Sequence, residues 1–291
     1  MKYTFIKSCY CATVLALLSA CGGSSGGGSS TPEPETLSGV FIDSPVQGLS
    51  WISGELSGTT DTDGTFQYVD GDSVQFLIGD ILLGETLGDA VITPLDLVDG
   101  AQDINNSTVL NIVKFLMTID NNSDPSNGIT ITNTVADLAS GETVDFSLSS
   151  SDFENSSEIQ ILISSLSSAT DAGARTIVST SEAQLHIGDS VKDLLTGTYS
   201  GTYAGDVSGT WTGTLSTSGT LTGTATDSSG ETANLSGTVS VDGSGATEFE
   251  SSGGATDGTI FSGTFDTNGT ASGTWNWFDE ESGTWTGSKV E

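Results

Sequence analysis

The sequence predicts a mainly β protein with a few helices, in which a small antiparallel β-sandwich with packed helices precedes an eight-stranded up-and-down β-barrel or meander. Short alternating hydrophobic runs separated by turn residues extend to about residue 100, which favours strands. Helical spacing of apolar residues follows, and a glycine–threonine repeat then runs to the end. The expected segments are a leader at 1–20, a tether at 21–36, a sandwich with helices at 37–195 and a barrel at 196–291.

The first twenty residues have the order of a bacterial secretory signal, with early lysines, an apolar run at 12–18 and small residues before Cys21. Leu18-Ser19-Ala20-Cys21 resembles the lipobox of bacterial lipoproteins. The resemblance implies that the Cys21 thiol is acylated and that the chain is cut just before it. The alternatives are a secreted protein with a free terminal thiol and, less favoured, a membrane-spanning helix, which needs about 20 apolar residues.

The residues around the lipobox bear on location and on cysteine chemistry. Gly22 follows the cysteine, and the sorting rule of the lipoprotein family then implies the outer membrane of a Gram-negative cell envelope. Cys9 and Cys11 both lie within the leader. The mature chain would therefore keep one lipidated thiol, with no disulfide, zinc site or cysteine nucleophile.

The chain is strongly acidic, with a formal net charge of −32, which removal of Lys2 and Lys7 would take to −34. A chain of this charge repels phosphate backbones, so we expect no nucleic-acid partner. It also repels anionic membrane surfaces, which leaves the lipid as the means of attachment. The acidic surface fits a role in solubility, and collection of divalent cations stays open.

Residues 22–36 have almost nothing to bury, because glycines and serines lead into Thr-Pro-Glu-Pro-Glu. Such a segment behaves as a flexible tether with a span of roughly 20 Å.

The region from 37 to about 100 predicts short strands separated by turns such as Asp63-Gly64 and Asp70-Gly71. Residues Gly58–Phe66 resemble the T-D-x-x-G-x-F hairpin of carboxypeptidase-regulatory-like, or transthyretin-like, β-sandwiches. The resemblance implies a small antiparallel sandwich that serves as an accessory module without catalysis. The strand candidates are 40–42, 49–52, 65–69 and 74–78.

Three amphipathic helices are predicted at 108–119, 156–166 and 181–195, the first with Ser107 as a candidate cap. A sandwich of about sixty residues buries little apolar surface alone, so we expect the helices to pack on it and form one domain.

From residue 197 onward an apolar residue, a glycine two places on and another apolar residue recur, as in Tyr199-Gly201-Tyr203, with Thr or Ser between them. Alternation places apolar groups and glycine on one face of a strand and hydroxyls on the other. Turn pairs such as Asp242-Gly243 and Asn268-Gly269 divide the segment into about eight strands, which can close. The texture is similar to avidin-like barrels and to barrels of surface lipoproteins. A transmembrane barrel is less favoured because the face that carries the hydroxyl groups is too polar to contact lipid. A β-solenoid is also less favoured, because the turns vary in length.

Two groups of residues are candidate sites. One group is aromatic and would line the mouth of a hollow barrel: Tyr199, Trp211, Trp275 and Trp285, with Tyr203 and Trp277. The alternative is a solid barrel in which these side chains form the core. The spacing of Asp120, Asn122 and Asp124 predicts a calcium (Ca2+) turn. It is not an EF-hand, because Pro125 and Ile131 occupy the sixth and twelfth places. The alternative is a polar loop that ends a helix.

No pattern in the chain predicts an enzyme. His186 is the single histidine, and no glycine-rich loop leads into a Lys and a Ser or Thr. We expect a lipid-anchored, non-catalytic envelope protein that acts as a surface binding or structural module, resembling an adhesin. Its partners would be a protein, a glycan or a small molecule. The second hypothesis is a small-ligand carrier that uses the barrel cavity, and the third is a glycan hydrolase.

Overall fold

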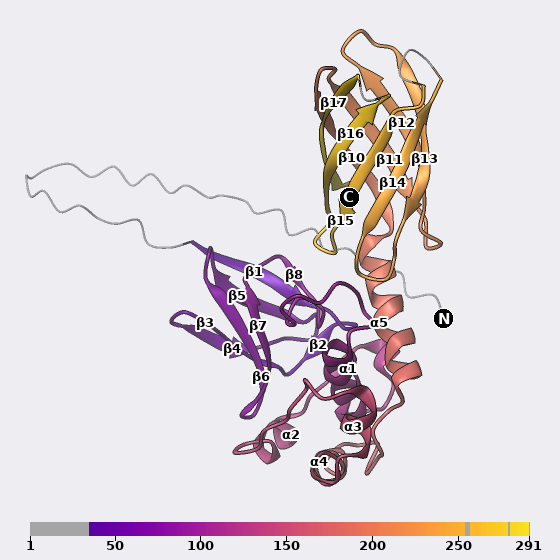
Figure 1. Cartoon of the computed structure of the whole chain (residues 1–291). Coiled ribbons are helices and arrows are strands. Elements are labelled where there is room, and N and C mark those ends of the chain that lie inside the picture. Colours follow the sequence, from indigo (N-terminus) through magenta and orange to yellow (C-terminus); the bar gives the residue numbers. More distant parts are fainter. Residues whose placement is uncertain (1–34, 254–256, 279, 291) are drawn as a thin grey trace, which may run out of the picture.

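A computed structural model describes residues 35–253, 257–278 and 280–290. It confirms the predicted fold class: small sheets and helices precede a closed barrel of eight antiparallel strands (Figure 1). The leader, Cys21 and the tether up to residue 34 lie outside the described residues.

The N-terminal sheets arise from the alternating runs that the sequence predicts. A four-stranded antiparallel sheet has the order β4-β3-β6-β7, a three-stranded sheet has the order β5-β1-β8, and β2 pairs with β9. Inward side chains such as Phe41, Phe66 and Phe76 are almost fully buried between these layers. The strands are β1 (Thr36–Phe41), β2 (Val46–Gln47), β3 (Ser50–Ser53), β4 (Leu56–Thr59), β5 (Thr65–Val69), β6 (Ser73–Ile78), β7 (Ile81–Leu87), β8 (Val91–Ile92) and β9 (Ile129–Thr130).

Two features of these sheets differ from the prediction. The pairs β1–β8 and β2–β9 are parallel, although the sequence predicts only antiparallel pairing. Each joins only two residues per strand, too few to leave a hydrophobic pattern. The Gly58–Phe66 segment does not form a hairpin either, since β4 pairs with β3 and β5 pairs with β1. The Asp63-Gly64 turn therefore carries the chain from one sheet to the other.

Helices α3, α4 and α5 pack against α1, whose residues from Val109 to Ile119 are all buried. Its N-cap is Asn106 rather than Ser107, because the Asn106 side chain accepts hydrogen bonds from the first helical N–H groups. The helices α2 and α3 are only six residues each, too short to show a helical period. The helices are α1 (Ser107–Ile119), the 3-10 helix η1 (Pro125–Asn127), α2 (Asn133–Leu138), α3 (Ser150–Asn155), α4 (Ser157–Ser167) and α5 (Thr180–Leu195).

The barrel is built by eight consecutive strands that each pair with the next, and β10 closes it against β17. Closure excludes the open meander that the sequence left as an alternative. Apolar residues and glycines face inward while the intervening threonines and serines are exposed, as the repeat predicts. The strands are β10 (Gly197–Gly205), β11 (Gly209–Leu215), β12 (Thr220–Asp227), β13 (Thr232–Val239), β14 (Ala246–Ser252), β15 (Ile260–Phe265), β16 (Thr270–Trp277) and β17 (Glu281–Lys289).

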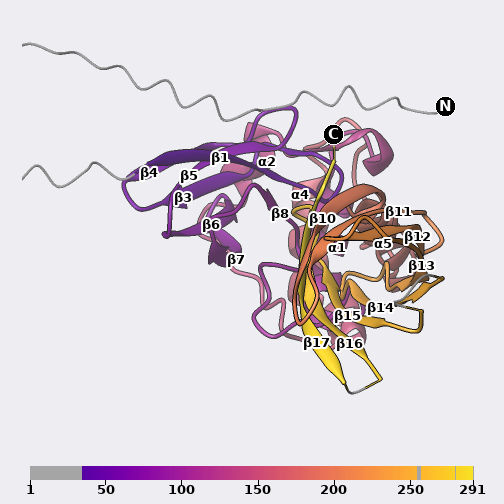
Figure 2. The same ribbon diagram turned by 90° about the horizontal axis from the view of Figure 1, so that it is seen from above.

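Helix α5 leads directly into β10 and gives the barrel two different ends (Figure 1). At the near end, which faces the N-terminal sheets, the Ile104 N–H donates to the Asp242 carbonyl at 2.9 Å. The Asn268 amide also donates to the Asp89 carboxylate there, at 3.0 Å. The far end carries the β10–β11, β12–β13, β14–β15 and β16–β17 connections. Seen from above, the N-terminal sheets lie to one side of the barrel (Figure 2). Within the described part of the chain, no helix combines the length and the hydropathy needed to span a membrane.

Candidate functional site

The interior of the barrel is filled with aromatic side chains. Tyr199, Trp211, Trp275 and Trp285 are 0, 2, 4 and 1 % exposed. Trp211 and Trp285 meet edge to face with ring centroids 5.6 Å apart. Tyr199 lies at the near end, where its hydroxyl donates to the Leu195 carbonyl at 2.8 Å. The four residues predicted to bind a ligand therefore belong to the packed core, and Trp275 also borders a cavity.

Inward-facing glycines make room for the indole rings. A Cβ on Gly273 would lie 2.6 Å from Nε1 of Trp285, and one on Gly283 would lie 2.5 Å from Nε1 of Trp275. Each indole N–H then reaches a wall carbonyl: Trp285 donates to Ser262 at 3.2 Å, and Trp275 donates to Ala204 at 3.1 Å. The glycine in the repeat thus lets a large ring lie against the backbone of the wall, where the indole N–H has a hydrogen-bond acceptor.

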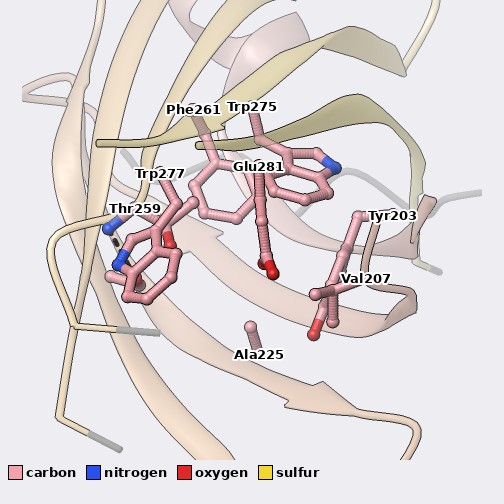
Figure 3. A pocket seen from close by; sticks show the side chains of 9 residues that line it. Tyr203, Val207, Ala225, Thr259, Phe261, Trp275, Trp277 and Glu281 are labelled. Carbon is pink, nitrogen blue, oxygen red and sulfur yellow. Dashed lines mark hydrogen bonds between the residues drawn. The ribbon is translucent and has the colours of Figure 1, made fainter. Parts of the chain in front are cut away.

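A cavity of about 30 Å³ opens at the far end of the barrel (Figure 3). Pockets for whole drug-sized ligands measure about 300 to 1,000 Å³. This one has room for a single small group that enters from outside. Its lining residues are Tyr203, Val207, Ala225, Ser251, Thr259, Phe261, Trp275, Trp277 and Glu281.

The walls of this far-end pocket are aromatic. Tyr203 meets both Phe261 and Trp275 edge to face, with ring centroids 6.3 Å apart in each pair. Trp277 forms part of the rim, and its indole N–H donates to the Asp257 carbonyl at 3.1 Å. Beside it, Phe278 is 69 % exposed, with its ring centroid 5.6 Å from that of Trp277.

Glu281 supplies the carboxylate of the pocket. It begins β17 opposite Trp277 in the ladder, and its side chain points between the aromatic walls (Figure 3). Its position in the sequence does not distinguish it from the other acidic residues of the chain. Every second residue of β17 faces the barrel interior, however, as Gly283 and Trp285 do. The same alternation places Glu281, two residues before Gly283, on the inward face.

The far end is acidic. From 196 to 288 the chain has no lysine or arginine. Lys289 lies at the near end, where its ammonium group donates to the Leu194 carbonyl at 2.7 Å. Burial and the charge of Asp227 raise the pKa of the Tyr203 hydroxyl, which keeps it neutral. Among the described residues, the acidic ones at the far-end strand termini and turns include Asp206, Asp227, Glu231, Asp257, Glu280 and Glu281.

The predicted calcium turn follows α1, and its oxygens already accept hydrogen bonds from the chain itself. The buried Asp120 carboxylate accepts from the N–H groups of Asp124 and Thr130, at 3.0 and 2.9 Å. Asn122 also accepts from the Asp124 N–H, and Asp124 accepts from the Ser126 hydroxyl. The spacing of Asp120, Asn122 and Asp124 is therefore explained by hydrogen bonds that hold the loop closed. Calcium binding stays a prediction, which a calorimetric titration tests.

A second polar feature joins α5 to the N-terminal sheets. The His186 ring lies 3.2 Å from the carboxylate of Asp43, which is fully buried. Within residues 35–253, 257–278 and 280–290, no group of three or more His, Cys, Asp or Glu side chains is placed to hold a metal ion.

No protein-family model matches the chain, and no curated protein matches it significantly.

Proposed function

We propose that this chain is a lipid-anchored, non-catalytic protein of the bacterial cell envelope, a surface module that binds its partner at the far end of the barrel. The far-end pocket carries the proposal. It is an opening with aromatic walls and a carboxylate, at the end of the barrel away from α5 and the N-terminal sheets.

Anchoring through Cys21 is supported by the lipobox-like tetrapeptide and by the glycine- and serine-rich segment that follows it. A tether of this composition would let the folded part reach beyond the membrane surface. The acidic surface, which is repelled by anionic lipid headgroups, favours attachment through acyl chains.

Binding at the surface is favoured over carriage of an enclosed ligand. The core aromatics fill the barrel, and the pocket at its far end measures about 30 Å³. A ligand therefore contacts this end with one group rather than entering whole. Phe278, a large aromatic residue left 69 % exposed beside the pocket, extends the apolar surface that a partner would cover.

Cys21→Ala tests the anchor. We expect the variant to lose incorporation of labelled palmitate and to move from the membrane fraction to the soluble fraction. Cys11→Ala, which changes a cysteine within the leader, is the matched control and should behave as the wild type. Equal labelling of Cys21→Ala and the wild type contradicts lipidation at Cys21.

Trp277→Ala tests the location of the binding surface. We expect the purified chain to bind intact cells of the producing species, and the substitution to reduce that binding at least about tenfold, as loss of a tryptophan that contributes strongly to an interface does. Thr212→Ala, on the exposed face of β11, is the control. Unchanged binding by Trp277→Ala would place the partner elsewhere on the molecule.

A further inference from the structure

We infer that the far-end pocket recognises an alkylammonium cation of the trimethylammonium type. This inference rests on the proposed function, because it names the chemical class of ligand for the same surface.

The aromatic walls carry the first step. Tyr203, Phe261, Trp275 and Trp277 line one small cavity. The faces of aromatic rings are electron-rich, and several rings around one space attract a cation whose own surface is apolar methyl or methylene. A trimethylammonium group has this combination of positive charge and apolar surface, which bare metal ions and neutral polar groups lack.

The carboxylate carries the second step. Glu281 points between these rings, and its carboxylate borders the space that a bound cation would occupy (Figure 3). Partial exclusion of water by the rings strengthens the attraction between the two charges. An anionic ligand is disfavoured by the same carboxylate and by the acidic far end, which has no lysine or arginine to compensate.

The other polar groups of the pocket narrow the ligand class. Ser251 and Thr259 are hydrogen-bonded to each other: the Ser251 N–H donates to the Thr259 carbonyl at 2.9 Å, and the Thr259 N–H donates to the Ser251 hydroxyl oxygen at 3.2 Å. Glu281 is the single carboxylate among the lining residues. A metal ion needs more oxygen ligands than that. An organic cation needs one charge and several rings.

Choline is the probe for the test, with the neutral analogue in which a tert-butyl group replaces the trimethylammonium group as the matched ligand control. Binding to the purified full chain is measured by calorimetry and by tryptophan fluorescence at low salt. We expect choline to bind and the neutral analogue to bind at least about tenfold more weakly. Added salt should weaken choline binding.

Two carboxylate variants locate the charge. Glu281→Gln should weaken choline binding about tenfold while leaving the weak binding of the neutral analogue unchanged. Glu280→Gln makes the same change of charge one residue away, on an exposed side chain, and should retain wild-type affinity. Unfolding of both variants is followed in urea, so that a loss of affinity is assigned to the site rather than to the fold.

Three results would overturn the inference: equal affinity for choline and its neutral analogue, equal weakening by the two glutamate variants, or a neutral glycan that binds the far end independently of Glu281. In the third case the proposed function stands and only the ligand class is wrong. The proposed function itself fails on different measurements, when Cys21→Ala stays lipidated or when Trp277→Ala binds cells normally.

Discussion

The pair formed by His186 and Asp43 joins a helix to the sheets through one titratable contact. Burial lowers the pKa of His186, but the hydrogen bond and charge of Asp43, with a smaller effect of Asp189, outweigh it and leave the pKa raised above 6.5. The protonated ring is therefore stabilised by the fold. Its contribution to stability is complete below about pH 6.5 and is lost as the pH rises through the raised pKa.

His186→Gln should destabilise the protein by about 1.5 to 3 kcal/mol at about pH 5, because the buried Asp43 loses a charged partner. At about pH 8.5 the difference from the wild type should shrink, since the stabilisation by the protonated ring is lost as the pH rises through the raised pKa. Urea unfolding at both values measures the two differences. Leu185→Ala, at an exposed neighbour on α5, is the control. A difference that is the same at both pH values would show that the pKa of His186 is the same in the folded and unfolded chains, which contradicts a pKa raised by the fold.

Lys114 and Glu154 form an asymmetric pair. Their charged atoms lie 2.8 Å apart, but the lysine side chain is fully buried whereas that of the glutamate is 32 % exposed. Glu154→Gln leaves an ammonium group buried without a countercharge, which costs about 3 to 5 kcal/mol. Lys114→Met keeps the volume, removes the buried charge and lets Glu154 hydrate. We expect Lys114→Met to lower the free energy of unfolding, measured in urea, clearly less than Glu154→Gln does. A larger loss in Lys114→Met than in Glu154→Gln would contradict this account of the pair.

At the scale of elements, the glycines of the repeat are steric requirements of the barrel wall. On Gly273 a Cβ would lie 2.0 Å from the Ser262 carbonyl oxygen of the neighbouring strand as well as against Trp285. Gly273→Ala should therefore cost at least about 1 to 3 kcal/mol, the usual cost of overpacking. Thr274→Ala, which changes the next, exposed residue, should stay within about 0.5 kcal/mol of the wild type. Urea midpoints followed by tryptophan fluorescence compare the two, and equal midpoints would contradict a tight wall at Gly273.

The predictability of an element follows the length of its pattern. The barrel repeats one alternation over eight strands, so its strands, turns and inward faces could be read from the sequence. The helix α1 was also readable, because apolar spacing persists over 13 residues. The parallel pair β1–β8 and the short helices α2 and α3 leave no period to detect. In the same way, residues such as Trp285 could be recognised as aromatic and inward, but only the closed barrel shows that they fill its centre.

On the scale of the whole molecule, the near-end loops seat the barrel on the N-terminal unit. Gly243 packs against Leu95 and Ile104 with a positive φ of 93°. The Ile104 side chain is 8 % exposed at this junction. Ile104→Asp should expose it and speed amide hydrogen exchange in the loop at 240–245, while the strands of the barrel keep their protection.

Asn105→Asp is the matched control for the junction, because it adds the same charge at an exposed neighbour. Its exchange should match that of the wild type. Should exchange rise equally in all barrel strands of Ile104→Asp, the barrel would depend on the junction for its own folding, and the two parts would be one cooperative unit.

The scarcity of lysine and arginine in the barrel has a practical consequence for experiments in which proteases release surface peptides from intact cells. Trypsin cleaves after lysine and arginine, and it finds neither between Lys192, in the last turn of α5, and Lys289. Complete digestion would therefore release the barrel sequence as one peptide that begins at Asp193. A survey of surface peptides based on trypsin alone would miss it for its size, whereas an enzyme that cuts after acidic residues would report every strand that unfolds.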